Sequence, residues 1–196
     1  MNNIETQAII IGGGATGAGI LRDLTLRGVR AVLIEKNDIA SGTTGRNHGL
    51  LHSGARYAVK DMESARECIR ENRILKKIAR HCIEDTGGLF VTLPEDDPSY
   101  HTRLLDSCRY AGIKAHEISI KEALKMEPNL NPDILSAVTV PDGTIDPFRL
   151  TSANILDAHE RGARVLTHTE VRRIIRRGDA AIGVGCLDRA SNDEFE

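Results

Sequence analysis

The residues with the clearest chemical meaning are three glycines near the amino terminus, Gly12, Gly14 and Gly17, and the acidic residue Glu35 that follows them. In this spacing the first glycine permits a tight turn, the second lets the backbone approach a pyrophosphate, and the third lets a helix pack closely. Unpaired N–H groups at the start of that helix attract phosphate, and a carboxylate such as Glu35 accepts hydrogen bonds from adenosine ribose hydroxyls. The same carboxylate repels a 2′-phosphate, which disfavours NADP. The pattern therefore predicts dinucleotide binding, but FAD and NAD present the same ADP half to it.

The elements needed to position these residues are predicted on both sides of the glycines. Residues 7–11 form an apolar, β-branched run typical of a buried parallel strand, and residues 15–27 carry apolar side chains at helical spacing. Gly28 suits a left-handed cap at the helix end, and residues 30–34 form a second strand that ends at Glu35. This order of strand, glycine turn, helix and strand predicts a βαβ unit of the Rossmann type.

The rest of the chain departs from simple alternation of strands and helices. Residues 37–57 are too polar and too rich in glycine for a regular core element, so we expect an extended functional loop. Helices are predicted at residues 61–82, 99–112, 118–131 and 146–162, the last starting with Asp146 as N-cap and Pro147 in the first turn. Strands are predicted at residues 89–93, 135–140, 163–167, 170–176 and 180–187. We expect the last three strands to return to the first sheet.

The composition argues against several classes of protein. A net charge of -2 and an aromatic content of 3% without Trp disfavour a nucleic-acid partner. The 4 cysteines are scattered without the spacing of a metal site, so we expect reduced structural thiols and no metal. The apolar run at residues 8–11 is far too short for a signal-peptide core or a membrane span, and a cytoplasmic protein is predicted.

Further motifs resemble one family. The loop contains the run Thr43-Thr44-Gly45-Arg46-Asn47-His48-Gly49-Leu50-Leu51-His52-Ser53-Gly54-Ala55-Arg56-Tyr57. Later runs are Gly88-Leu89-Phe90-Val91-Thr92-Leu93-Pro94-Glu95-Asp96-Asp97 and Val140-Pro141-Asp142-Gly143-Thr144-Ile145-Asp146-Pro147-Phe148-Arg149-Leu150. Together with the glycine turn, these motifs resemble the FAD-dependent glycerol-3-phosphate dehydrogenases, and more narrowly the catalytic, FAD-carrying chains of the bacterial anaerobic type. The resemblance runs over nearly all of the chain up to about Cys186.

The resemblance implies an α/β fold of the D-amino-acid-oxidase type, in which a Rossmann-type FAD-binding domain is interrupted by an inserted α+β substrate domain. We expect residues 1–86 and 148–187 to form the FAD-binding domain, residues 87–147 to form part of the substrate domain, and residues 188–196 to be a polar tail. The implied activity is FAD-dependent oxidation of sn-glycerol 3-phosphate to dihydroxyacetone phosphate. Electrons would pass to a quinone through partner subunits, which would hold the protein peripherally on the inner face of the cytoplasmic membrane.

The resemblance also carries over individual site residues, although it assigns no catalytic residue. Those expected to contact FAD are Gly12, Gly14, Gly17, Glu35, Thr43, Thr44, Arg46, Asn47 and, through its backbone, Val171. Those expected near the substrate are His52, Arg56 and Tyr57. Arg56 suits bidentate pairing with a phosphate, and Tyr57 suits a hydrogen bond to a substrate oxygen. In the alternative interpretation Arg56 neutralises the flavin pyrophosphate or a carboxylate, His52 is a hydrogen-bonded loop residue, and Tyr57 packs at the domain junction.

Catalytic chains of this family are much longer than 196 residues, so the resemblance implies a fold that is incomplete at the C-terminus. Because the affinity of an FAD site depends on walls from both halves of the chain, we expect weak or no activity from this chain alone. Two other functions remain open. One is an oxidase or dehydrogenase of another small hydroxy acid or amine on the same fold. The other is a non-catalytic module for nucleotide binding or subunit interaction.

Overall fold

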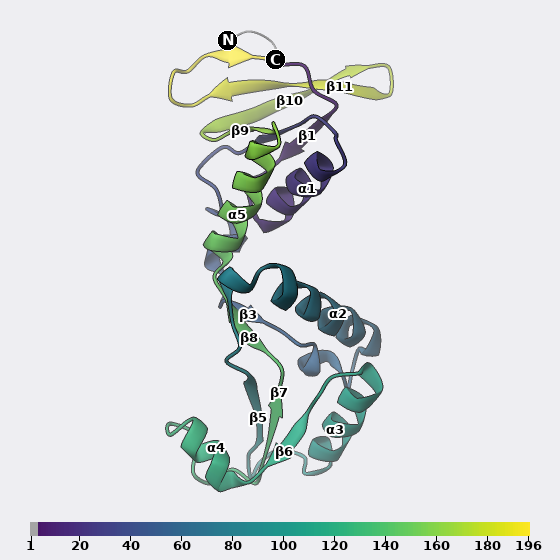
Figure 1. The fold of residues 1–196 in the computed structure, drawn as a ribbon, viewed down its shortest axis with the longest axis vertical. Coiled ribbons are helices and arrows are strands. Elements are labelled where there is room, and N and C mark those ends of the chain that lie inside the picture. Colours follow the sequence, from purple (N-terminus) through teal and green to yellow (C-terminus); the bar gives the residue numbers. More distant parts are fainter. Residues whose placement is uncertain (1–3) are drawn as a thin grey trace. The chain divides into compact units, whose positions relative to one another are not determined.

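A computed structural model describes residues 4–196, and the first three residues of the predicted FAD-binding domain lie outside this range. The chain divides into two compact units. One contains residues 4–48 and 146–196, and the other contains residues 49–145 (Figure 1).

The first unit is built on a parallel sheet of three strands, β1 (Ala8–Ile11), β2 (Ala31–Ile34) and β9 (Arg164–Leu166), in the order β1-β2-β9. Two helices, α1 (Ala15–Leu26) and α5 (Pro147–Glu160), pack against each other beside this sheet (Figure 1). All four residues of β2 are buried, which explains why its sequence is continuously apolar. Leu33 of β2 joins Leu21 of α1 and Ala158 of α5 in one apolar cluster. The predicted βαβ unit is therefore confirmed.

An antiparallel sheet covers the opposite face of β2. It contains β10 (Thr169–Arg177), β11 (Ala180–Asp188) and β12 (Glu194–Phe195) in that order. Val32 and Ile34 of β2 pack with Val184 and Phe195 from this sheet. Of the three strands expected to return to the first sheet, only β9 does so, and that part of the prediction was wrong. The reason is the tight hairpin at Gly178, which pairs β10 with β11 instead of with β2.

The predicted polar tail also differs from the structure. Residues 194–195 form β12, which pairs with β11 through Cys186 and Leu187. Phe195 is 8% exposed and lies in the apolar cluster under the antiparallel sheet. A strand of two residues has no periodicity to detect, and a single apolar side chain in a polar run is a weak signal.

The second unit holds two small antiparallel sheets and most of the remaining helices. One sheet has the order β3 (Leu50–Leu51), β8 (Gly143–Ile145) and β4 (Ile83–Glu84), and the other has the order β5 (Gly88–Thr92), β7 (Ser136–Val140) and β6 (His116–Ile118). The helices are α2 (Met62–Ile78), α3 (Ser99–Ala111) and α4 (Ile120–Met126), with short 3-10 turns η2 (Ala55–Tyr57) and η3 (Arg80–Cys82). Val138 of β7 packs with α2 and α3 on one face, whereas Ala137 packs with α4 on the other.

The boundary between the units differs from the predicted domain boundary. Residues 49–86, expected in the FAD-binding domain, pack with the second unit. Ala65 and Ile69 of α2 join Leu104 and Cys108 of α3 in one core, and β3 pairs with β8. These contacts join segments far apart in the sequence, and local periodicity does not report such pairing.

Burial of the thiols leads to a testable prediction. Cys108 is 0% exposed, and burial, assisted by the Asp142 carboxylate, raises the pKa of its thiol to about 11. A raised thiol pKa keeps the group protonated, and at pH about 8 the reactive thiolate is on the order of one part in a thousand. We expect iodoacetamide to leave Cys108 unmodified in the folded chain and to alkylate it after unfolding, as followed by peptide mass spectrometry. Equal alkylation rates in the two states would contradict this packing.

Candidate cofactor-binding and anion-binding sites

The glycine turn joins β1 to α1 as the fingerprint predicts. Gly12 has a φ of 112°, and its N–H donates to the carbonyl oxygen of Ile34 at 2.8 Å. A Cβ added at Gly17 would lie 2.0 Å from the carbonyl oxygen of Gly12, so α1 approaches the turn as closely as backbone allows. Gly14 is the N-cap of α1 and has no side chain of its own to cap the helix, and within the described chain no acidic residue occupies the first turn. The positive end of the helix dipole thus faces the turn without a negative side chain of its own.

Glu35 lies beside this turn, at the end of β2. Its Oε2 accepts a hydrogen bond from the backbone N–H of Gly13 at 2.8 Å, and its Oε1 accepts one from the backbone N–H of Asn37, also at 2.8 Å. The carboxylate is half-buried. The structure therefore brings Glu35 and the glycine turn together, the arrangement that binding of an ADP group requires.

The predicted flavin loop begins with η1 (Thr43–Arg46), a 3-10 turn next to the start of α1. Thr44 is the residue that contacts the helix, because its Oγ1 accepts from the N–H of Ala15 at 3.0 Å. Asn47 Nδ2 donates to the carbonyl oxygen of Thr44 at 2.6 Å and closes the turn. Thr43 and Arg46 lie on the same turn. All four loop residues therefore lie on one short segment, with Thr44 placed directly against the helix N-terminus.

Val171 lies on β10, half-buried in the apolar cluster below β2. Its strand reaches the glycine turn indirectly, because the N–H of Thr169 donates to the carbonyl oxygen of Glu35 at 2.9 Å.

Sequence reasoning missed Arg189, whose Nη1 donates to the carbonyl oxygen of Lys36 at 3.0 Å and to Asn37 Oδ1 at 2.7 Å. No local signal marks this arginine, because its partners are more than 150 positions away in sequence.

A second group of candidate residues lies within the other unit. His52 follows β3, and Arg56 and Tyr57 lie on η2. Arg56 Nη1 lies 3.4 Å from His52 Nε2, and the Arg56 guanidinium carbon lies 5.3 Å from the centre of the Tyr57 ring. The three predicted substrate-side residues are therefore neighbours, and an arginine stacked on an aromatic ring suits recognition of an anion. Asp142 belongs to the same group, because its Oδ2 lies 3.6 Å from His52 Nδ1. The sequence placed Asp142 in one of the runs that resemble the family but assigned it no role.

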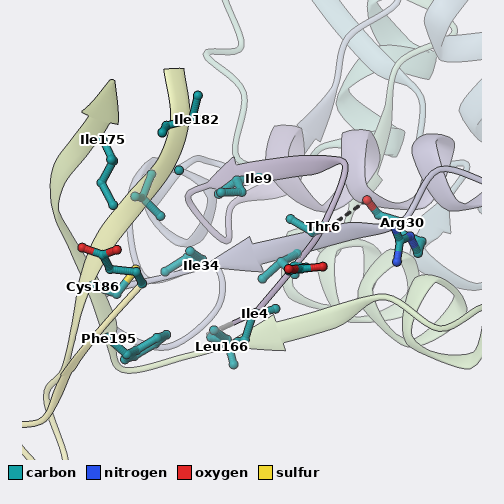
Figure 2. A pocket seen from close by; sticks show the side chains of 15 residues that line it. Ile4, Thr6, Ile9, Arg30, Ile34, Leu166, Ile175, Ile182, Cys186 and Phe195 are labelled. Atoms are coloured by element: carbon teal, nitrogen blue, oxygen red, sulfur yellow. Dashed lines mark hydrogen bonds between the residues drawn. The ribbon is translucent and has the colours of Figure 1, made fainter. Parts of the chain in front are cut away.

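The first unit also contains a pocket of about 420 Å³ between its two sheets. Figure 2 shows that Ile9, Ile34, Leu166, Ile182 and Phe195 contribute side chains to it, and the remaining lining mixes aliphatic side chains with the polar residues Glu5, Thr6, Arg30 and Glu196. The glycine turn and Glu35 do not line this pocket. Its aliphatic side chains lie between the layers, and the carboxylates of Glu5 and Glu196 in its lining would repel a pyrophosphate.

The described residues 4–196 lack two kinds of functional feature. They contain no helix long and apolar enough to cross a membrane. They also contain no group of three or more His, Cys, Asp or Glu side chains arranged to hold a metal ion. The four arginines of β10, at positions 172, 173, 176 and 177, all lie at exposed positions, as expected of a solvated face.

Residues 7–194 match the model of the family described as FAD dependent oxidoreductase, abbreviated DAO. The match covers nearly the whole chain, and the chain therefore belongs to the FAD-dependent oxidoreductase family. It is homologous to the A subunit of the anaerobic glycerol-3-phosphate dehydrogenase of Haemophilus influenzae, with 58% identity over 194 residues that cover 99% of this chain and 34% of the relative. The predicted resemblance is thereby confirmed. The chain spans about a third of the length of the curated relatives it matches.

Solved structures agree with this assignment. L-proline dehydrogenase from P. horikoshii has a TM-score of 0.83 and 27% identity, covering 95% of this chain and 50% of that chain. The glycerol-3-phosphate dehydrogenase from Bacillus halodurans, complexed with FAD, has a TM-score of 0.71 and 26% identity, covering 100% of this chain and 33% of that chain. The predicted α/β fold of the D-amino-acid-oxidase type and the predicted FAD dependence of the family are confirmed.

The glycine turn fits the ADP half of FAD on its own geometry. The helix start carries no acidic side chain in its first turn within the described chain, and the absence of a Cβ at Gly17 lets the helix pack against the backbone of Gly12. Glu35 supplies a carboxylate at the distance of one hydrogen bond from the same backbone. A pyrophosphate and a ribose need these three features.

Proposed function

We propose that this chain provides the ADP-binding part of an FAD site in an enzyme that oxidises sn-glycerol 3-phosphate to dihydroxyacetone phosphate. The observation that carries the proposal is the close approach of Gly17 to Gly12 beside Glu35 and beside the start of α1, which has no acidic residue in its first turn. The identity of 58% to the A subunit of an anaerobic glycerol-3-phosphate dehydrogenase supports the choice of substrate.

Each candidate residue has a role in this proposal. Backbone at Gly12, Gly14 and Gly17 and the start of α1 bind the pyrophosphate, and Glu35 accepts from the ribose hydroxyls. The loop residues Thr43, Thr44, Arg46 and Asn47 lie along the flavin, and the backbone at Val171 borders the adenine. When bound, FAD supplies the acceptor for the hydride that leaves the substrate carbon.

The substrate-side residues bind and orient the phosphorylated alcohol. Arg56 pairs with the phosphate through its planar guanidinium, which the Tyr57 ring supports from one face. Tyr57 donates a hydrogen bond to a substrate oxygen. His52 accepts from Arg56 and holds the guanidinium in place. Partner subunits take the electrons to a quinone and account for peripheral attachment at the inner face of the cytoplasmic membrane.

Nucleotide selectivity tests the cofactor half of this proposal. We expect the chain to bind ADP and to bind 2′,5′-ADP at least about tenfold more weakly, because the Glu35 carboxylate repels the added phosphate. Isothermal titration calorimetry with the two nucleotides measures the ratio, and Glu35→Gln is expected to reduce it towards one. Equal affinities for the two nucleotides in the unaltered chain would refute the role given to Glu35.

A second candidate activity is oxidation of a small amine or hydroxy acid. The TM-score of 0.83 to an L-proline dehydrogenase favours it, because that enzyme shares this fold. The two activities differ in the role of Arg56. Only a phosphorylated substrate carries a dianionic phosphate, which the Arg56 guanidinium would pair with. Binding of sn-glycerol 3-phosphate, L-proline and glycine to the chain, compared with binding to Arg56→Met, separates them. If Arg56→Met loses binding of glycerol 3-phosphate alone, the first activity is supported. If the affinity of Arg56→Met for glycerol 3-phosphate is unchanged, the second activity is supported.

A further inference from the structure

A buried carboxylate lies next to the substrate-side residues. Asp142, in the turn between β7 and β8, is 9% exposed, and its Oδ1 accepts from the backbone N–H of Ser53 at 2.6 Å. Its Oδ2 lies 3.6 Å from His52 Nδ1, and the other ring nitrogen, Nε2, lies 3.4 Å from Arg56 Nη1. The three side chains thus form a continuous series from a buried carboxylate to an arginine.

The chemistry of these contacts selects one form of the His52 ring. A guanidinium only donates hydrogen bonds, so His52 Nε2 must be the nitrogen without a proton. The proton of the neutral ring is then on Nδ1, where it faces the Asp142 carboxylate. A doubly protonated ring would direct its Nε2–H at the Arg56 guanidinium, which cannot accept a hydrogen bond. The neutral tautomer with Nε2–H would do the same, and it would also leave the Asp142 carboxylate without a donor on Nδ1. Only the neutral ring with Nδ1–H satisfies both neighbours.

The turn that carries the Asp142 carboxylate is held in place by two side chains of α2. Lys76 Nζ donates to the carbonyl oxygens of Pro141 at 2.9 Å and Asp142 at 3.1 Å. Asn72, which is 2% exposed, donates from Nδ2 to the carbonyl oxygens of Leu51 at 3.2 Å and Pro141 at 3.3 Å. The carboxylate lies on the turn at Pro141 and Asp142. Through these contacts, α2 fixes this turn to β3, the strand that precedes His52. A side chain fixed in this way can set the tautomer and the orientation of a neighbouring imidazole.

We propose that Asp142 is a positioning residue, which acts through His52 to direct the Arg56 guanidinium towards an anionic group of the substrate. Stacking on Tyr57 restrains the plane of the guanidinium, and the hydrogen bond to His52 restrains its rotation within that plane. The identity of the anion as the phosphate of glycerol 3-phosphate rests on the proposed function. The tautomer of His52 does not.

The substitution Asp142→Asn separates a positioning role from a merely structural one. The backbone N–H of Ser53 retains the amide oxygen, so the amide NH₂ takes the place of Oδ2 and faces His52 Nδ1. His52 Nδ1 must then accept, and the proton moves to Nε2, where it opposes Arg56. In His52→Gln, by contrast, the side-chain oxygen accepts from Arg56 without help from Asp142.

Nitrogen chemical shifts of the histidine rings report the tautomer directly, measured by NMR at pH about 8, where an ordinary imidazole is neutral. His52→Gln identifies the His52 signals. We expect Nδ1–H in the unaltered chain, Nε2–H in Asp142→Asn, and no change in the control Asp179→Asn, at an exposed position of the first unit. Nε2–H in the unaltered chain would overturn the proposal. An unchanged tautomer in Asp142→Asn would overturn it as well.

Binding of sn-glycerol 3-phosphate gives an independent measure. We expect Asp142→Asn to lower the affinity about tenfold, and to have no further effect in the His52→Gln background, because both changes act on the same guanidinium. An equal loss in both backgrounds would show that Asp142 does not act through His52. If the unaltered chain binds no glycerol 3-phosphate, the proposed substrate is refuted, whereas the tautomer still decides the role of Asp142.

Discussion

Replacing Gly17 by Ala is expected to abolish nucleotide binding and to destabilise the first unit. The added Cβ would lie 2.0 Å from the carbonyl oxygen of Gly12 and 3.3 Å from the side chain of Ile10. The contact is with backbone, so it is relieved only if α1 moves away from the turn, which withdraws the helix start from the phosphates. We expect ADP affinity to fall by more than about a hundredfold and the free energy of unfolding to fall by about 2–3 kcal/mol. Calorimetry and denaturant unfolding measure the two effects.

Gly19→Ala is the matched control for this variant. It lies on the same helix, and apart from the helix's own backbone and its chain neighbours no atom of the described chain lies within 4 Å of the added Cβ. We expect ADP binding to be retained and the helix to gain up to about 1 kcal/mol from the better helix former. If Gly17→Ala and Gly19→Ala bind ADP equally well, the close approach of helix and turn is not what binds the nucleotide.

Replacing Gly54 by Ala is expected to be the most damaging single change in the second unit. Gly54 has a φ of +91°, and an added Cβ would lie 2.5 Å from the carbonyl oxygen of Ala65 and 2.9 Å from Cys68 Cβ. Left-handed strain and a backbone clash together should cost about 3 kcal/mol or more. Since Gly54 precedes η2, relief of the clash displaces Arg56, and we expect glycerol 3-phosphate binding to be lost along with stability.

Gly112→Ala separates the two causes of this loss. Gly112 also has a positive φ, +77°, but no atom of the described chain, apart from its own helix backbone and neighbours, lies within 4 Å of an added Cβ. The control should therefore show only the conformational strain, about 1 kcal/mol, and should keep its affinity for the anion. Equal destabilisation of the two variants by thermal unfolding would show that η2 is not packed against α2 as described.

The parts of the fold that sequence alone predicted are those with local signals. The βαβ unit follows from two apolar runs around a glycine turn, and the structure places β1, α1 and β2 within one or two residues of the predicted bounds. Capping residues were equally informative. Asp61 accepts from the N–H of Ser64 at the start of α2, and Asp146 accepts from the N–H groups of Phe148 and Arg149 at the start of α5.

The parts that sequence did not predict depend on contacts between distant segments. The hairpin of β10 and β11 forms its own sheet, and residues 49–86 pack with the second unit, because burial is decided by partners that periodicity does not identify. The same holds for the candidate sites. Glu35 and the glycine turn were predictable from spacing. Asp142 and Arg189 instead reach their partners across the fold, and no sequence signal assigned either of them a role.

The most direct test of the central claim is a titration of the isotope-labelled chain with ADP, followed residue by residue by NMR of the backbone amides. The account predicts that the largest shifts occur at residues 12–18 and 35–37, and that they disappear in Gly17→Ala but not in Gly19→Ala. Absence of ADP binding, or shifts confined to the apolar pocket between the two sheets of the first unit, would contradict it.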